Sequence, residues 1–188
     1  MASPHHLALR RALRIAAGAA LSASALSTSF HPVAAQPAAT APAPQAIDPA
    51  TFVRVVRSLA ILQARAAEHA ASRETRPETR AFAQKMAAFR GEQLPKLDAV
   101  ARERQVAVGA VLEFEHQVIL ENLQPLDSLE LSRRYAELQL QALEQEIRAY
   151  GAAERAPDER LRGYAAELRP RLEQLLEEAR AMRQAVGP

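Results

Sequence analysis

Residues 48–66, DPATFVRVVRSLAILQARA, carry the clearest helix signal in the chain. Asp48 can cap a helix start with its side chain, and Pro49 fits the first helical position. After them, apolar side chains recur at intervals of three and four residues, which is the spacing of one helix face. These side chains are Phe52, Val55, Val56, Leu59, Leu62 and Ala66. The pattern predicts an amphipathic helix from Asp48 to about Ser72.

A second helix is expected to begin at Pro77, after a short polar connection. Pro95 lies inside it and removes one backbone hydrogen bond, so we expect a kink near Gly91. The helix is expected to continue past this proline, because the apolar periodicity resumes after it. Its predicted buried stripe is Phe82, Met86, Phe89, Leu97 and Val100.

One short helix and two long ones are expected to follow. The short helix covers residues 111–123, ends before Pro125, and has the apolar residues Val111, Phe114, Val118 and Ile119. Asp127 and Glu130 resemble a capping box at the start of the third long helix. The fourth is expected to begin near Pro157 and to kink at Pro170. The predicted inner faces of the two long helices are Leu131, Tyr135, Leu138, Ala142 and Ile147, and Leu161, Tyr164, Leu168, Leu172, Leu175, Leu176 and Met182.

These patterns together predict an all-α fold. Four long amphipathic helices with short connections favour an antiparallel four-helix bundle over residues 48–188, with the short extra helix between helices two and three. No segment shows sustained two-residue alternation of β-branched residues, so we expect no sheet.

The N-terminal segment, residues 1–35, predicts a cleavable signal peptide. A basic region runs to Arg14, an Ala-rich apolar region follows, and Val33-Ala34-Ala35 offers a cleavage site before Gln36. An uncleaved segment that tethers the protein to the inner membrane is the alternative, although a spanning helix needs about 20 mainly apolar residues. Residues 36–47 are rich in Pro and Ala and predict an extended linker. The protein is therefore expected in the periplasm.

Composition narrows the classes of function. The chain has no Cys, which excludes disulfides, zinc–thiolate sites, thiol nucleophiles and lipidation at a cysteine. Three of the 24 basic residues lie in the signal segment. The basic residues that remain are about as many as the 22 acidic residues. A nearly neutral body without a basic cluster argues against a nucleic-acid partner.

Several segments resemble a bacterial family of exported ferritin-like bundles, a domain of unknown function often labelled as outer-membrane proteins. The resemblance covers nearly all of residues 48–183 and rests on the order and spacing of weak motifs. These are Phe52-Val53-Arg54, Pro77-Glu78 with Ala81-Phe82-Ala83-Gln84-Lys85-Met86, His116-Gln117 with Leu120 to Leu123, Tyr135, and Leu168 to Leu172 around Pro170. A helical body does not fit the outer-membrane label, because outer-membrane spans are β-barrels.

The chain departs from that family at positions that matter for metal binding. Family members often carry a His in each of helices two, three and four, and these positions correspond here to Arg90, Leu143 and Leu175. Acidic positions of helix one correspond to Gln63 and Arg65. If members of the family bind metal in the bundle, the resemblance implies that this chain does not.

Glu113-x-x-His116 is the first candidate site, because it has the spacing of a ligand pair in di-iron bundles. A working centre needs a second such pair and two more carboxylates. The only other His after residue 35 is His69, which has no Glu three residues before it. We therefore favour a polar helix face, with His116 capping or packing at the bundle mouth.

Two other groups of residues are candidate sites. Glu68 and His69 end the first helix, where a surface His interacts with the helix dipole. The acids Glu144, Glu146, Glu173 and Glu177 could form an inward carboxylate cluster. Arginines nearby at ion-pair spacing favour a solvated, salt-bridged face instead; they are Arg148, Arg169, Arg180 and Arg183.

The sequence therefore predicts no catalytic residue, no metal site and no cofactor. We expect a non-enzymatic module in the periplasm that binds an envelope partner or protects against stress. The alternatives are a metal-binding ferritin-like oxidoreductase, and a membrane-apposed bundle that opens at Gly91, Pro95 and Pro170 to bind a lipid or a partner. The partner is an unidentified protein or envelope component, and contact with a membrane surface and self-association both stay open.

Overall fold

The computed structural model describes residues 46–73, 75–107 and 112–187. The predicted signal peptide, residues 1–35, lies outside the described residues. So do most of the predicted linker and Val111, the first apolar residue of the predicted short helix.

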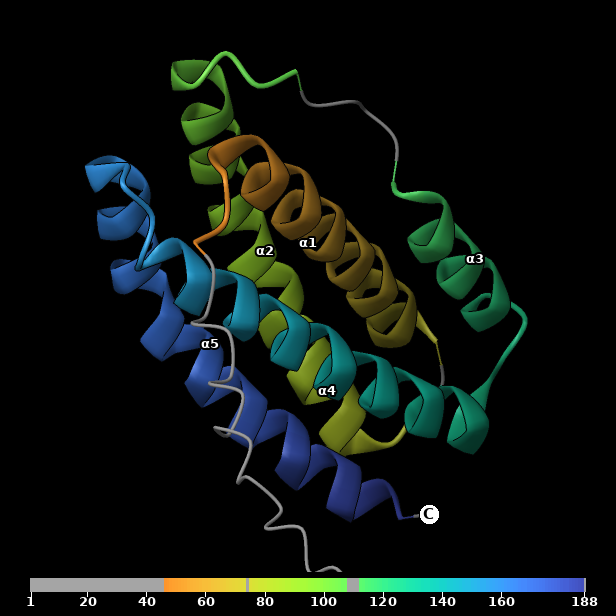
Figure 1. Cartoon of the computed structure of the whole chain (residues 1–188). Helices are drawn as coiled ribbons and strands as arrows, with labels where there is room; N and C mark the ends of the chain where they lie inside the picture. The colour runs from red at the N-terminus through yellow and green to blue at the C-terminus, as the bar shows by residue number, and fades with distance from the viewer. Residues whose placement is uncertain (1–45, 74, 108–111, 188) are drawn as a thin grey trace, which may run out of the picture. The chain divides into compact units, whose positions relative to one another are not determined.

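Every regular element in the described part of the chain is a helix (Figure 1). The helices are α1 (Pro49–Ser72), α2 (Pro77–Glu103), α3 (Phe114–Leu123), α4 (Ser128–Ala153) and α5 (Glu159–Val186). The all-α prediction is confirmed. Pro95 and Pro170 lie inside α2 and α5, and both helices continue through them, as expected.

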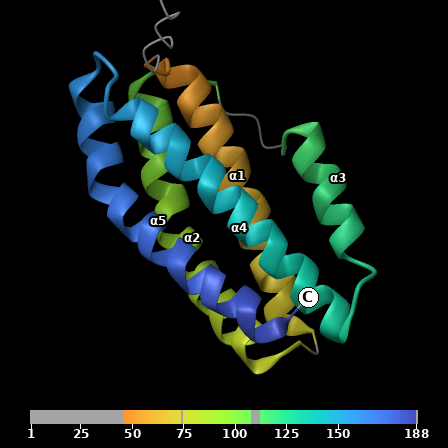
Figure 2. The same ribbon diagram turned by 60° about the horizontal axis from the view of Figure 1, so that its bottom comes forward.

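The four long helices form a ring in which α1 packs on α2 and α4, and α5 packs on α4 and α2. Neighbours in this ring are antiparallel: Phe52 near the start of α1 contacts Tyr150 near the end of α4. Likewise, Arg160 at the start of α5 pairs with Glu103 at the end of α2. The diagonal helices α2 and α4 run in the same direction (Figures 1 and 2). The connection between them therefore crosses the length of the bundle, and α3 lies in this crossover.

The predicted inner faces form the core. Of their members, Phe52, Leu59, Met86 and Leu172 are among the largest fully buried side chains. Five predicted members are only partly buried, namely Val55, Phe89, Val100, Ile147 and Tyr164. No helix in the described ranges is long and apolar enough to cross a membrane.

The three apolar residues of α3 that were expected in its buried stripe are exposed, so that prediction was wrong. Phe114, Val118 and Ile119 are 80%, 36% and 40% exposed. The buried residues of α3 are His116, Leu120 and Leu123. Because α3 lies outside the ring and packs mainly on α1, only one narrow face of it is covered (Figure 2).

One of the two predicted helix caps is present, and Asp158 supplies a cap that was not predicted. Asp48 accepts hydrogen bonds from the backbone N–H groups of Ala50 and Thr51, and Asp158 accepts one from Leu161. Asp127 stands before α4 but its side chain caps no N–H group, so the capping-box prediction was wrong. The first residue of α4, Ser128, has a φ of 46°, in the left-handed region. This turns the chain out of the geometry that a capping box requires.

The two aspartates provide a matched pair of substitutions. We expect Asp158→Ala to lower the free energy of unfolding by about 1 kcal/mol, because an N–H group of α5 loses its cap and Arg104 loses its ion-pair partner at 2.6 Å. Asp127→Ala is expected to change it by a few tenths of a kcal/mol, since no capping bond is lost. Urea denaturation of both variants measures the difference. Equal losses would mean that neither the cap nor the ion pair of Asp158 stabilises the bundle.

Candidate functional site

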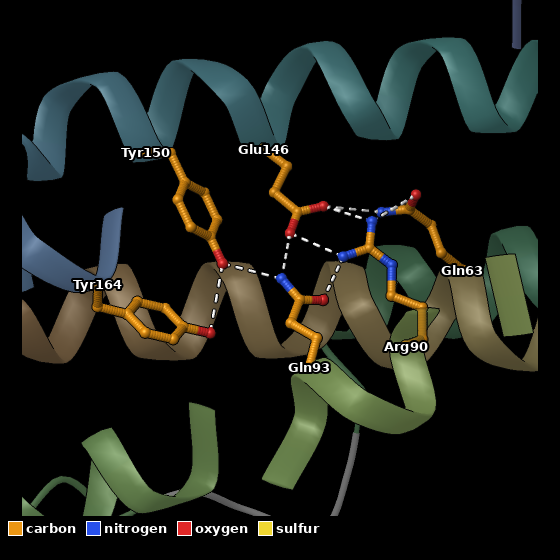
Figure 3. Close-up of polar contacts among 6 residues, drawn as sticks. All are labelled: Gln63, Arg90, Gln93, Glu146, Tyr150 and Tyr164. Atoms are coloured by element: carbon orange, nitrogen blue, oxygen red, sulfur yellow. Dashed lines mark hydrogen bonds and ion pairs between the residues drawn. The ribbon is translucent and has the colours of Figure 1, made fainter. Parts of the chain in front are cut away.

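The centre of the bundle contains a buried network of polar side chains (Figure 3). Gln63 comes from α1, Arg90 and Gln93 from α2, and Glu146 and Tyr150 from α4. Each is at most 2% exposed. Three helices of the ring thus meet through polar side chains at a level where the rest of the core is apolar.

An ion pair forms the middle of the network. Arg90 donates through Nη1 to Oε1 of Glu146 at 2.9 Å and through Nη2 to Oε2 at 2.7 Å. Both side chains are fully buried. Such a bidentate pair fixes the relative orientation of the two helices as well as balancing the two charges.

Two glutamines flank the ion pair, and each contacts both of its members. Gln63 accepts from Arg90 Nη2 at 2.9 Å and donates to Glu146 Oε2 at 3.2 Å. Gln93 accepts from Arg90 Nη1 and donates to Glu146 Oε1 at 2.9 Å. The carboxylate of Glu146 thus accepts four hydrogen bonds, which is about its full capacity.

Two tyrosines extend the network toward α5. Gln93 Nε2 donates to the Tyr150 hydroxyl at 2.8 Å, and this hydroxyl lies 3.5 Å from that of Tyr164. Burial raises the pKa of Tyr150, and the nearby carboxylate of Glu146 raises it further. Burial also raises the pKa of Tyr164, to about 12. Both phenols therefore stay protonated at neutral pH and act as hydrogen-bonding groups.

The residues present do not fit a metal centre in the bundle. Arg90 supplies a fixed cation at the point where the polar side chains converge, and it and the two glutamines take up the oxygens of Glu146. Leu143 and Leu175, at two of the positions where the family often has His, are fully buried apolar side chains. Within the described ranges, no three His, Cys, Asp or Glu side chains cluster in a way that could hold a metal ion.

The structure places three of the four candidate acids at the surface and one in the core. Glu144 and Glu177 both pair with Arg180, at 3.6 and 2.6 Å, and Glu173 pairs with Arg169 at 2.9 Å. For these three, the prediction of a salt-bridged surface is confirmed. For Glu146 it was wrong, because this side chain points into the core and pairs with Arg90.

Sequence reasoning missed the network as a unit. Gln63 and Arg90 had been singled out only as departures from the family, yet they are hydrogen-bonded to each other. A signal was present: Gln63, Arg90 and Glu146 each occupy a position at three- or four-residue spacing within an apolar stripe. One buried cation and one buried anion on different helices predict an ion pair between them, because an unpaired buried charge is too costly.

Glu113 and His116 do not act as a ligand pair. The Glu113 carboxylate lies 3.6 Å from Arg54, and His116 Nδ1 lies 2.6 Å from the Ser58 hydroxyl of α1. Ser58 also accepts a hydrogen bond from the Glu113 backbone N–H at 2.9 Å. His116 therefore packs on α1 and helps to fix the start of α3.

His69 lies at the opposite end of the contact between α1 and α3. It is partly buried, while its neighbour Glu68 is exposed. Burial lowers the pKa of His69, the charge of Arg73 lowers it further, and a backbone hydrogen bond with Leu123 of α3 opposes this. A surface His that interacts as a cation with the helix dipole was expected, and partial burial corrects that expectation.

Acidification is expected to destabilise the protein through these two histidines. Burial lowers the pKa of His116 below its ordinary value of 6.5, although Glu113 and Glu115 partly oppose this. The unfolded chain therefore binds more protons than the folded one as pH falls through 6.5 and below, and stability falls with it. We expect the free energy of unfolding to drop between pH 7.5 and pH 5.5. The drop should be smaller in His116→Gln, which cannot gain this charge, and equal drops would contradict the assignment.

Comparison with known proteins identifies one family. A family model described as a domain of unknown function, DUF4142, matches residues 33–182. No curated protein and no solved structure matches the chain.

Proposed function

Because the chain belongs to the DUF4142 family, whose function is unknown, its role has to be argued from its own surface, and we propose a binding module. In this proposal, the protein is exported to the periplasm, is not an enzyme, and acts by holding a partner in the cell envelope. The bundle is the scaffold, and α3 is the binding element.

The observation that carries the proposal is the exposure of apolar side chains on α3. Phe114, Val118 and Ile119 lie within six residues of one short helix, and each is more than a third exposed. Exposed apolar side chains close together on one element can mark an interaction site. Phe114 has 80% of its surface in water, so it contributes little to the core. Contact with a partner would remove this apolar surface from water.

The core supports a scaffold function over an enzymatic one. Its polar groups are buried, and the Glu146 carboxylate and the two terminal nitrogens of Arg90 are taken up by hydrogen bonds within the network. A catalytic centre needs reactive groups that a substrate can reach. One long crossover between the second and third long helices is the connectivity of ferritin-like bundles, which supports a ferritin-like fold without the metal chemistry.

Export is proposed on the grounds of residues 1–35. The basic region, the short apolar region and the small residues Val33, Ala34 and Ala35 have the pattern of a cleaved signal peptide. N-terminal sequencing of protein from a periplasmic extract is expected to begin at or near Gln36. Recovery of Arg10 to Arg14 in a membrane fraction would point to the tethered alternative.

Affinity capture from a periplasmic extract tests the binding function. The wild-type protein and Phe114→Ser serve as baits, and Phe114→Tyr is the matched control because it keeps the ring. We expect a partner that is retained by the wild type and by Phe114→Tyr and is lost with Phe114→Ser. Equal retention by all three baits, or by none, would remove α3 as the binding element.

A further inference from the structure

The exposed face of α3 borders a groove. One hollow, of about 480 Å³, lies between α3 and α4, and a second, of about 470 Å³, lies around the start of α3. Gln141 of α4 lines the first hollow and Gln145 lines the second. These residues lie one helical turn apart, so the two hollows are neighbours at α4. The second hollow is otherwise lined by α1 and by the start of α3. We call them together the α3 groove.

The α3 groove has the length and lining that suit a helix. Its residues on α4 run from Glu130 to Gln145, which corresponds to roughly 22 Å of helix. Apolar side chains line it at intervals, with polar side chains between them. The apolar lining is Val55, Phe114, Ile119, Leu123, Leu126 and Leu138. An amphipathic helix binds in such a groove through anchors three and four residues apart.

Charge indicates the kind of helix. From Val106 to Ser132, the chain has five acidic residues and no Lys or Arg, although the chain as a whole is nearly balanced. The acids are Glu113, Glu115, Glu121, Asp127 and Glu130. Arg54 and Arg134 line the groove as well, but they pair with Glu113 at 3.6 Å and with Glu130 at 3.0 Å. The acids that line the groove are Glu113, Glu115, Glu130 and Glu137, against the two arginines, so the lining is net negative as well as partly apolar.

The apolar lining and the negative charge together favour one kind of occupant over a second copy of the chain or a membrane surface. A second copy would bring an acidic α3 against an acidic α3, and like charges oppose such contact. Anionic membrane surfaces attract basic segments and repel acidic ones. A helix with an apolar stripe and basic flanks can contact both the apolar and the acidic residues that line the groove.

We propose that the α3 groove binds a basic amphipathic helix of another polypeptide. The inference rests on the binding function proposed above and specifies the chemistry of its partner. Apolar side chains of that helix would cover Phe114 and Ile119, and its Lys or Arg residues would reach Glu115. Glu115 has no ion-pair partner within the described part of the chain.

The test uses a fluorescently labelled helical peptide of about 14 residues, composed of Leu along one face and Lys along the other. The control peptide has the same Leu face and Glu in place of Lys. Fluorescence anisotropy with the purified protein is expected to show binding of the Lys peptide that weakens with salt, and no binding of the Glu peptide. Because the chain has no Trp, Phe114→Trp gives a second readout, an emission that shifts to the blue when the peptide covers the ring.

Three variants locate the binding site. Phe114→Ser is expected to lower the affinity for the Lys peptide about tenfold or more, because a large apolar contact is lost. Glu115→Lys is expected to lower the same affinity several-fold, because the new positive charge repels the lysines of the peptide. Glu92→Lys is the matched control, since it makes the same charge change on an exposed part of α2 and should leave affinity unchanged. Unchanged melting temperatures confirm that each variant is folded.

Several outcomes would overturn the proposal. With the peptides, these outcomes are equal binding of both or binding of neither. Two further outcomes are Phe114-dependent binding to phosphatidylglycerol vesicles in place of the peptide, and self-association that Phe114→Ser abolishes. If the peptide fails while Phe114→Ser still loses a periplasmic partner, only the class of partner is wrong. If the peptide and the affinity capture both fail, the binding function itself is wrong.

Discussion

Arg90→Met is expected to lower the free energy of unfolding by about 3–5 kcal/mol, the cost of breaking a buried ion pair. The substitution keeps most of the side-chain volume, so the loss comes from charge and hydrogen bonding. Glu146 would stay in the core without its cation, and the carbonyl oxygens of Gln63 and Gln93 would each lose a donor. Urea denaturation at neutral pH measures the change.

Two comparisons isolate the role of the buried charge. In Arg90→Met/Glu146→Leu, no unpaired charge remains, so the double variant is expected to be less destabilised than the sum of the single variants. Arg169→Met is the control, because Arg169 also pairs with a Glu at 2.6 Å but is 36% exposed. Its loss is expected to be at most about 1 kcal/mol. A loss for Arg90→Met no larger than that of Arg169→Met would show that the network does not stabilise the bundle.

Leu172→Ala is expected to lower the free energy of unfolding by about 2–5 kcal/mol, the range for truncating a buried Leu. Leu172 is fully buried on the inner face of α5, one turn from both Leu168 and Leu176. Removal of three carbon atoms there leaves a cavity that the surrounding helices can only partly fill. Urea denaturation followed by circular dichroism at 222 nm would measure the loss.

The control for Leu172 is a larger apolar side chain that is exposed. Phe114→Ala removes more carbon atoms than Leu172→Ala, but Phe114 is 80% exposed. The free energy of unfolding is expected to change by at most about 0.5 kcal/mol. A larger loss for Phe114→Ala than for Leu172→Ala would mean that α3 packs more tightly on the bundle than its exposure indicates.

The four long helices could be predicted because their signals are local. Asp48 with Pro49, and Asp158 after Pro157, mark helix starts within two or three residues, and Leu172 lies in an unbroken apolar stripe. The orientation of α3 could not be predicted in this way. Its apolar residues have no partner helix on that side, and which face is covered depends on where the crossover runs across α1.

The ion pair could be inferred only in part. Arg90 and Glu146 are 56 positions apart, and the spacing on each helix shows burial but not which side chains meet. Whether Glu146 faced Arg90 or the arginines of α5 depended on a rotation of α4 of less than one turn. Both Glu144 and Glu146 were compatible with the surface prediction, and the structure separates them by placing Glu146 opposite α2.

The crossover also has a consequence for how the chain folds. It separates two helical hairpins, α1 with α2 and α4 with α5, whose contacts are local and can form quickly. Gln63, Arg90 and Gln93 belong to the first hairpin, and Glu146 and Tyr150 to the second. The two charges are therefore hydrated until the hairpins dock. A docking shifted by one helical turn, about 5.4 Å, would bury Arg90 and Glu146 apart from each other, at a cost of several kcal/mol for each ion. The pair thus selects the register in which the two halves of the chain combine.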